Sequence, residues 1–290
     1  MAGLNYSTKK KLFRTLCYFL LYFSMCIILM PLIIMFFNSF MSERELYTNN
    51  YPNFHIFPRE WNTLGELFAN YKWVVSTSGR GIDTFINSLK IVIPTTIIST
   101  IVACLAAYPL SRAKLKGRNT ILFVFLFASM VPTMAILIPL YEQFVKMGLY
   151  DTIWAVIIVL TAYNLPFAIW IMKAFFDTIP DSLEEAAMID GCTRIQSLTK
   201  IIAPLAMPGI SAIAVYSFIF AWADFLIPLV LTRVKAQVFT AYIGTFISTE
   251  YKEVTTVLAL GVVSSIPVVI IALAFQKLII RGLTEGAIKG

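Results

Sequence analysis

The sequence predicts an all-α membrane protein with six transmembrane helices, and three observations support this fold class. The 290-residue chain is 59% hydrophobic and 13% charged, with a mean hydropathy of +0.79, whereas soluble domains carry about 25% charged residues. Six apolar runs reach the roughly 20 residues that a helix needs to cross a bilayer. Basic residues gather at the ends of several of these runs. We therefore expect residues 1–290 to form a single transmembrane domain.

The first apolar run follows a basic stretch and could be mistaken for a signal peptide. It is too long for the apolar part of one, and no small-residue cleavage site closes it. The third run contains Pro132 and Pro139, and we expect a kink there because proline leaves a backbone carbonyl without its helical partner. The predicted spans are residues 16–37, 89–110, 121–140, 152–172, 208–231 and 254–280.

The basic residues also predict the orientation of the chain. Residues 9–11 are all lysine, and a second basic cluster lies in 112–118, whereas the long polar segment 42–84 carries few basic residues for its length. Lys and Arg concentrate in cytoplasmic loops, so we expect both termini in the cytoplasm. The net charge of +7 is then explained by orientation rather than by nucleic-acid binding.

The segment 42–84 has no run of membrane length, and we expect it outside the membrane with short interfacial helices. It is rich in aromatic residues, including Trp61 and Trp73. These could bind a sugar or form an interfacial aromatic belt, and the sequence favours neither interpretation.

Several kinds of chemistry have no residues to support them. The only histidine is His55, so neither a Ser-His-Asp triad nor a histidine-rich metal site can be assembled. No glycine is followed by lysine, so the phosphate-binding P-loop is absent. The four cysteines have no paired spacing. We predict a non-catalytic chain without metal or cofactor. An ion-coupled secondary transporter is a rival class, although it usually has more intramembrane ionisable groups or paired repeats, and a membrane-embedded enzyme is another.

The connection between the fourth and fifth spans reads as two short helices joined by a corner. Ser182 and Glu185 have the spacing of a capping box. Gly191 stands where a helix ends in a left-handed residue, and Thr193 begins a second capping box. We expect Pro204 to end the second helix, because the residue before proline avoids the α region.

The loop contains Glu185-Ala186-Ala187, then Gly191 after three residues, Ile201 after nine more, and Pro204. This pattern resembles the cytoplasmic coupling loop of bacterial ABC importer permeases, with Ala203 in place of the usual leucine. The resemblance covers nearly the whole chain and implies the type I importer fold with cytoplasmic coupling helices. It implies an ATPase-coupling role for the loop 181–204, and we expect Gly191→Asp to uncouple ATP hydrolysis from uptake. The residues assigned to coupling are Glu185, Ala186, Ala187, Asp190, Gly191, Ile201 and Pro204.

Other stretches resemble the carbohydrate branch of these permeases: the Asn87-Ser88-Leu89 sequence that opens the second span, the run ending at Arg112, and the tail from Gly282. The chain is similar to the smaller permease subunit of maltose-type importers. This implies a heterodimer with a second permease, two ATPase subunits that bind ATP and Mg, and an extracytoplasmic solute-binding protein in a bacterial cytoplasmic membrane. The implied cargo is a saccharide, with an oligosaccharide favoured; a solute such as a glycerol phosphate is the alternative.

Asp224 is an ionisable residue inside the predicted fifth span, where a carboxylate is costly. Its surroundings resemble the sugar-permease pattern Trp-Asn-Asp/Glu-Phe, with Ala223 in place of the amide. Trp222 could stack on a sugar ring and Asp224 could accept hydroxyl hydrogen bonds along a substrate path. Alternatively, Asp224 caps a helix break near Pro228.

Overall fold

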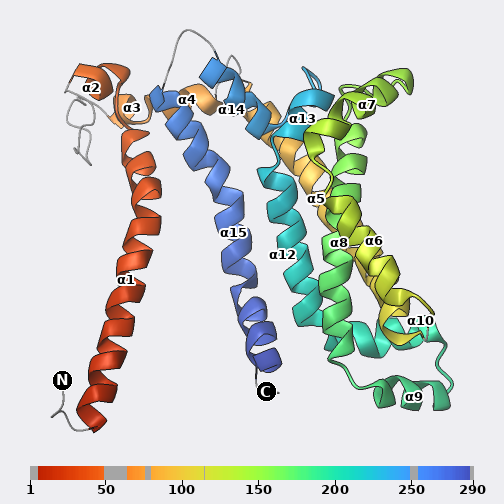
Figure 1. Cartoon of the computed structure of the whole chain (residues 1–290). Helices are drawn as coiled ribbons and strands as arrows, with labels where there is room; N and C mark the ends of the chain where they lie inside the picture. The colour runs from red at the N-terminus through yellow and green to blue at the C-terminus, as the bar shows by residue number, and fades with distance from the viewer. Residues whose placement is uncertain (1–5, 49–63, 76–79, 114, 249–253, 288–290) are drawn as a thin grey trace. The chain divides into compact units, whose positions relative to one another are not determined.

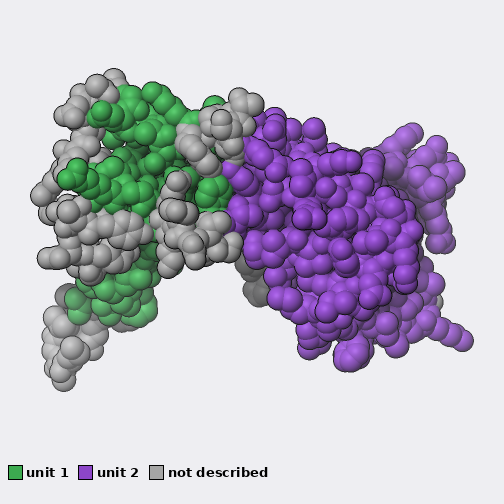
Figure 2. Space-filling view, turned by 90° about the horizontal axis from the view of Figure 1, so that it is seen from above, with its two compact units in different colours: residues 1–79, 246–263 green, residues 80–245, 264–290 purple. Residues whose placement is uncertain are grey.

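The structure is a computed structural model that describes residues 6–48, 64–75, 80–113, 115–248 and 254–287. Within these residues the chain is helical and has no strand, in agreement with the predicted fold class. The chain divides into two compact units, shown in Figure 2, and each is described by itself. Unit 1 comprises Met1–Gly79 with Phe246–Val263, and unit 2 comprises Arg80–Thr245 with Ser264–Gly290. The single-domain assignment stays a prediction.

Unit 1 is built on the long helix α1 (Tyr6–Asn38), whose stretch Lys10–Asn38 is long and apolar enough to cross a membrane. The predicted external segment does contain short helices, namely α2 (Glu43–Thr48), α3 (Leu64–Leu67) and α4 (Ala69–Val75). The Glu43 carboxylate accepts hydrogen bonds from the backbone N–H and the hydroxyl of Thr255, at 2.8 and 2.9 Å. His55 and Trp61 lie outside the described residues.

Unit 2 is organised around three helices that pack side by side: α5 (Gly81–Arg112), α8 (Ile153–Asp177) and α12 (Met207–Ala223) (Figure 1). The helix α5 begins about two turns before the predicted start of the second span. Asn87 and Ser88 therefore lie within the helix and do not open it.

The predicted third span is two helices rather than one kinked helix. The helices α6 (Arg118–Ser129) and α7 (Thr133–Lys146) meet at 84°. Pro132 is the residue that precedes α7, where its missing N–H costs no helical hydrogen bond. The prediction that proline distorts the third span is confirmed, but at Pro132 the distortion is a break between two helices and not a kink within one.

The predicted fifth span is also divided, because α12 ends at Ala223 and a short helix α13 (Leu226–Leu231) follows. Residues 232–238, here called the strap, lead from α13 to α14 (Phe239–Ser248). The last helix, α15 (Val254–Ala287), continues beyond the predicted end at residue 280. Four described helices are long and apolar enough to cross a membrane, and the count reaches six if each bent pair is one span.

The core of unit 2 contains two clusters of buried apolar side chains. The strap-side cluster includes residues from the parts of α5, α8 and α12 nearest the strap, and the loop-side cluster includes residues from the opposite parts of the same helices. Members of the first are Val92, Leu160, Phe218 and Trp222, and members of the second are Ala103, Ala168, Met172, Phe176, Ile202 and Ile213.

Candidate functional site

The corner between α9 (Asp181–Ile189) and α10 (Arg194–Ser197) has the geometry predicted for Gly191. Gly191 has φ +88°, its N–H donates to the Met188 carbonyl at 3.1 Å, and the N–H of Cys192 donates to the Ala187 carbonyl at 3.0 Å. These two bonds form a Schellman motif, which requires the left-handed residue. A Cβ at Gly191 would meet nothing within 4 Å, so backbone conformation, and not space, selects glycine here.

One of the two predicted capping boxes is present. The Thr193 hydroxyl accepts from the Gln196 N–H at 3.3 Å, and the Gln196 side chain accepts from the Thr193 N–H at 2.9 Å. The box predicted at Ser182 is wrong, because the N-cap of α9 is Pro180, two residues earlier, and the helix begins at Asp181. Asp181 then lies in the first turn, where the helix dipole favours a carboxylate.

The predicted stop at Pro204 is also wrong. A π-helical segment, Leu198–Ile202, follows α10, and α11 (Ala203–Leu205) continues through the proline. The N–H of Ala203 bonds to the Leu198 carbonyl, five residues back, and Pro204 falls in the first turn of α11, where an N–H is not needed. The chain turns instead at Ala206, by 81°.

A buried arginine ties α9 to the end of α5. Arg112 forms an ion pair with Asp181, and its Nη2 donates to the Ile179 carbonyl at 2.9 Å. Its Nε lies 3.2 Å from Oε2 of Glu184, without hydrogen-bond alignment, so this contact is electrostatic. The side chains of Arg112 and Glu184 are only 8% and 10% exposed.

Tyr108, one turn before Arg112, completes the contact between α5 and the corner. Its hydroxyl donates to Oε1 of Glu184, and its Oη lies 3.3 Å from the Arg194 carbonyl oxygen at the start of α10. We call Tyr108, Arg112, Asp181 and Glu184 the corner clamp.

Sequence reasoning missed the corner clamp as a unit. The sequence predicts for Arg112 only a role in membrane orientation and a family resemblance, and it predicts coupling at Glu185 and not at Glu184. A usable signal was present: Tyr108 and Arg112 share one face of α5 at i,i+4, and Asp181 and Glu184 share one face of α9 at i,i+3.

The predicted coupling residues occupy different environments on the corner. Glu185, Ala186 and Asp190 are exposed, Ala187 is buried, and Ile201 packs on the loop-side cluster. Large apolar side chains are also exposed around the corner. They are Leu183, Met188, Ile189 and Ile195, the last two being 85% and 73% exposed. An exposed apolar surface on a charged loop is typical of a protein-binding site.

Trp222 and Asp224 lie at the other end of unit 2, and both are engaged within the chain. The Trp222 side chain is buried, and its indole N–H donates to the Ser264 carbonyl at 2.9 Å. The Asp224 carboxylate accepts from the Ile227 N–H at 3.0 Å. The alternative prediction, that Asp224 caps a helix break near Pro228, is confirmed. The roles of both residues in a substrate path stay predictions.

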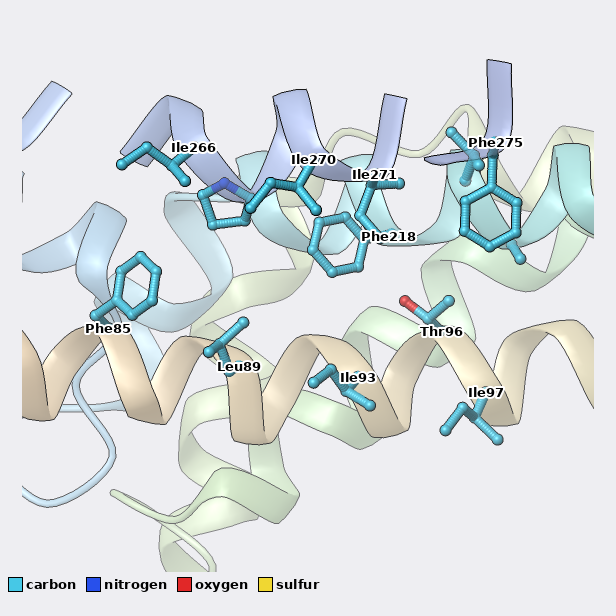
Figure 3. A pocket seen from close by; sticks show the side chains of 13 residues that line it. Phe85, Leu89, Ile93, Thr96, Ile97, Phe218, Ile266, Ile270, Ile271 and Phe275 are labelled. Carbon is cyan, nitrogen blue, oxygen red and sulfur yellow. The ribbon is translucent and has the colours of Figure 1, made fainter. Parts of the chain in front are cut away.

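A groove of about 590 Å³ lies between α5, α12 and α15 (Figure 3). Its lining is apolar except for Thr96, whose hydroxyl donates to the Val92 carbonyl at 2.8 Å. Sugar recognition requires several placed polar groups, so this groove lacks the chemistry of a saccharide site.

The strap is held by a second charged residue that the sequence did not single out. Asp151, which has φ +57°, accepts hydrogen bonds from the backbone N–H groups of residues 233–236, at 2.8 to 3.2 Å. Burial raises the pKa of the Asp151 carboxyl. The four backbone donors together lower it by more than burial raises it, so the pKa lies below the ordinary value. Asn87 adds a 2.9 Å hydrogen bond to the Lys235 carbonyl, and Ser88 accepts from the Phe239 N–H at 2.8 Å. We call the Asp151 contacts the strap clamp.

Unit 2 is therefore a helical bundle with an exposed corner, clamped to α5, on the loop between α8 and α12. Residues 99–285 match the family described as binding-protein-dependent transport system inner membrane component, and the chain belongs to this family.

Named relatives and a solved structure agree with this assignment. The chain is 34% identical over 266 residues to the inner membrane ABC transporter permease protein YcjP of Escherichia coli (strain K12), covering 91% of this chain and 92% of YcjP. It is 38% identical over 230 residues to the trehalose transport system permease protein SugB of Mycobacterium tuberculosis, covering 77% and 82%. A bacterial ABC transporter involved in the import of the acidic polysaccharide alginate aligns with a TM-score of 0.75 and 25% identity, covering 95% of this chain and 99% of that chain.

Proposed function

We propose that this chain is the permease subunit of an ATP-driven, binding-protein-dependent importer of a saccharide, most simply an oligosaccharide. The clamped corner is the observation that carries the proposal, because it joins the predicted coupling sequence to a rigid and exposed surface. The printed names of relatives support the cargo class: SugB is a trehalose permease, and another relative, 37% identical, is a trehalose/maltose permease of Thermococcus litoralis.

The corner is suited to transmit motion from an ATPase. It continues into α8 on one side and through α11 into α12 on the other, while Arg112 ties it to α5. A force on α9 therefore reaches all three central helices of unit 2. A rigid-body switch of this kind would convert closure of an ATPase dimer into alternating access. The exposed apolar side chains Ile189 and Ile195 would enter the ATPase surface, with Glu185 facing a basic residue there.

The remaining parts of the proposal concern partners and topology. This permease would pair with a second, different permease and two ATPase subunits, which would bind ATP and Mg, and an extracytoplasmic binding protein would deliver the cargo. The corner and both termini would face the cytoplasm. Trp222 and Asp224 stand as candidate path residues, and Trp222 would have to leave the Ser264 carbonyl to reach a sugar.

The test is co-purification of this chain with its partner permease and ATPase in lipid nanodiscs. ATP hydrolysis is measured with and without the binding protein and a panel of saccharides. We expect one saccharide-loaded binding protein to stimulate hydrolysis. Stimulation only by a glycerol phosphate would replace the cargo class, and failure to bind any ATPase would overturn the coupling role.

Substitutions at Gly191 sharpen this test. A β-branched side chain is strained at positive φ, so Gly191→Val should cost about 1–2 kcal/mol at the corner and uncouple hydrolysis from uptake. Gly191→Asp should uncouple in the same direction but less, since Asp tolerates the left-handed region better. Gly191→Asn is the matched control and should retain coupling. Equal uptake by all three variants at equal expression would contradict the proposal.

A further inference from the structure

Unit 2 contains a layer of buried polar side chains that the coupling role does not use. They come from all three central helices and are at most 9% exposed in the isolated chain. The members of this polar layer are Thr95 and Ser99 on α5, Thr161 and Asn164 on α8, and Ser217 on α12.

The polar layer separates the two apolar clusters of the core. On each of the three helices its residues lie, along the sequence, between a member of the strap-side cluster and a member of the loop-side cluster. These flanking pairs are Val92 and Ala103 on α5, Leu160 and Ala168 on α8, and Phe218 and Ile213 on α12. The three helices pack against one another, and the flanking residues of all three meet in the same two clusters, so the five residues lie between these clusters.

These side chains lack hydrogen-bond partners. The four hydroxyls and both amide atoms of Asn164 have none within the described part of the chain. Hydroxyls in apolar helices commonly bond to a carbonyl one turn back, as Thr96 does to Val92 and Ser88 does to Thr84. Pro166 adds a further polar group, since it has no N–H to donate to the Ala162 carbonyl.

Such groups are expensive inside a membrane protein. An unsatisfied polar group at this depth costs several kcal/mol, because no solvent is available to replace the missing partner. A species that supplies hydrogen bonds to all five would remove this cost.

The chemistry of the layer limits what that species is. None of the five side chains ionises near neutral pH, so they cannot relay protons and offer no charge to a divalent cation. Ser99, Asn164 and Ser217 are fully buried, which excludes a sugar or a partner chain. Hydroxyls and an amide offer both donors and acceptors, and a small molecule with both is water, which needs two to four polar partners.

We propose that the polar layer is an internal water site that bridges α5, α8 and α12. The bound water would satisfy Asn164 and the surrounding hydroxyls together. The bundle then has a hydrated layer between two dry apolar clusters, halfway between the corner and the strap. This site is independent of the transport proposal.

Radiolytic footprinting tests the site directly, because X-ray-generated hydroxyl radicals label side chains beside trapped water. The probe is the full-length chain in nanodiscs, read out by mass spectrometry at Leu165. This partly buried residue is next to Asn164 and lies at the edge of the loop-side cluster, and the fully buried Met172, seven residues further along α8, is the dry reference. We expect Leu165 to be labelled and Met172 to be protected. The double variant Asn164→Leu/Ser217→Ala should lose the Leu165 label, whereas Thr96→Val should keep it. An unlabelled Leu165 in the wild type, or a label unchanged in the double variant, would overturn the proposal.

Thermal unfolding provides a second test that does not depend on labelling. If water bridges the layer, Ser99→Ala leaves the other members unsatisfied and should lower the melting temperature by about 2–4 °C. Asn164→Leu should do the same. The variant that combines Ser99→Ala with Asn164→Leu should lower the melting temperature by less than the sum of the two single effects. Thr96→Val, which removes a hydroxyl already bonded to a carbonyl, should change little. A rise in melting temperature for both single variants would show that the side chains are unpartnered, and would contradict a water site.

Discussion

The two ends of unit 2 each hold a loop with a charged residue, but by different means. At the corner clamp, the Arg112 side chain meets the side chains of Asp181 and Glu184. At the strap clamp, the Asp151 carboxylate meets only backbone N–H groups of residues 233–236. The corner is therefore specified by side chains on both sides of the contact, whereas the strap contributes only backbone groups to its contacts with Asp151 and Asn87.

This difference predicts which substitutions matter. Removing one partner of a buried ion pair leaves the other charge buried and unpaired, which destabilises the fold more than replacing both partners with apolar residues would. Backbone donors are supplied by any residue other than proline, so the strap should tolerate changes of its own side chains. The comparison can be tested in four steps, from the largest expected effect to the smallest.

The largest effect is expected at Arg112. Arg112→Ala would leave the Glu184 carboxylate buried without its cation and should cost about 3–5 kcal/mol. Limited proteolysis of the loop 181–204 and retention of the ATPase on purification would measure it. The control is Lys173→Ala, which removes an i,i+4 pair with the more exposed Asp177 and should cost about 0.5 kcal/mol or less. Similar losses for the two variants would refute the special role of the corner clamp.

A smaller effect is expected at Asp151. Asp151→Ala removes the acceptor for four backbone N–H groups and should cost about 1–3 kcal/mol. Asp151→Asn retains one carbonyl oxygen and should recover part of this loss. Hydrogen exchange of the strap amides is the direct readout. Unchanged protection of residues 233–236 in Asp151→Ala would contradict the strap clamp.

The strap clamp should also respond to acid. The folded pKa of Asp151 lies below its ordinary value of 3.8, so the folded state favours the ionised carboxylate. Its stabilisation is present above the unfolded pKa and is lost as the pH falls through the lower, folded pKa. The difference in melting temperature between the wild type and Asp151→Ala should be constant from pH 7 to about pH 5 and shrink below about pH 4. A difference that grows on acidification would reverse the sign and reject the assignment.

The smallest effect is expected within the strap itself. Arg233 and Lys235 contact Asp151 through their backbone N–H groups, so alanine at either position keeps these hydrogen bonds. The stability should change by no more than about 0.5 kcal/mol. The contrasting variant Arg233→Pro deletes one donor and should weaken the strap. A large loss for Arg233→Ala would mean that its side chain, and not its backbone, holds the loop.

Much of the fold and the outline of the candidate site follow from the sequence. The lengths of apolar runs depend only on the order of residues along the chain, and they predicted the helical membrane class and the long helices. Gly191 and the Thr193 capping box are local motifs, closed by residues a few positions apart, so their geometry is encoded within the segment. The Ser182 box failed because α9 begins at Asp181. The Pro204 stop failed because a π-helical segment precedes α11, which accommodates the proline in its first turn.

Only the tertiary structure decided which polar residues work together. Arg112 and Glu184 are 72 positions apart by number, and Asp151 meets residues more than 80 positions away. The five residues of the polar layer come from three helices, α5, α8 and α12, that pack against one another. Periodicity within a helix identifies a face, but it contains no information about which face of another helix lies opposite. The sequence by itself determined the long helices and the corner at Gly191, because these depend on local residue order. Packing of distant segments determined the two clamps and the polar layer.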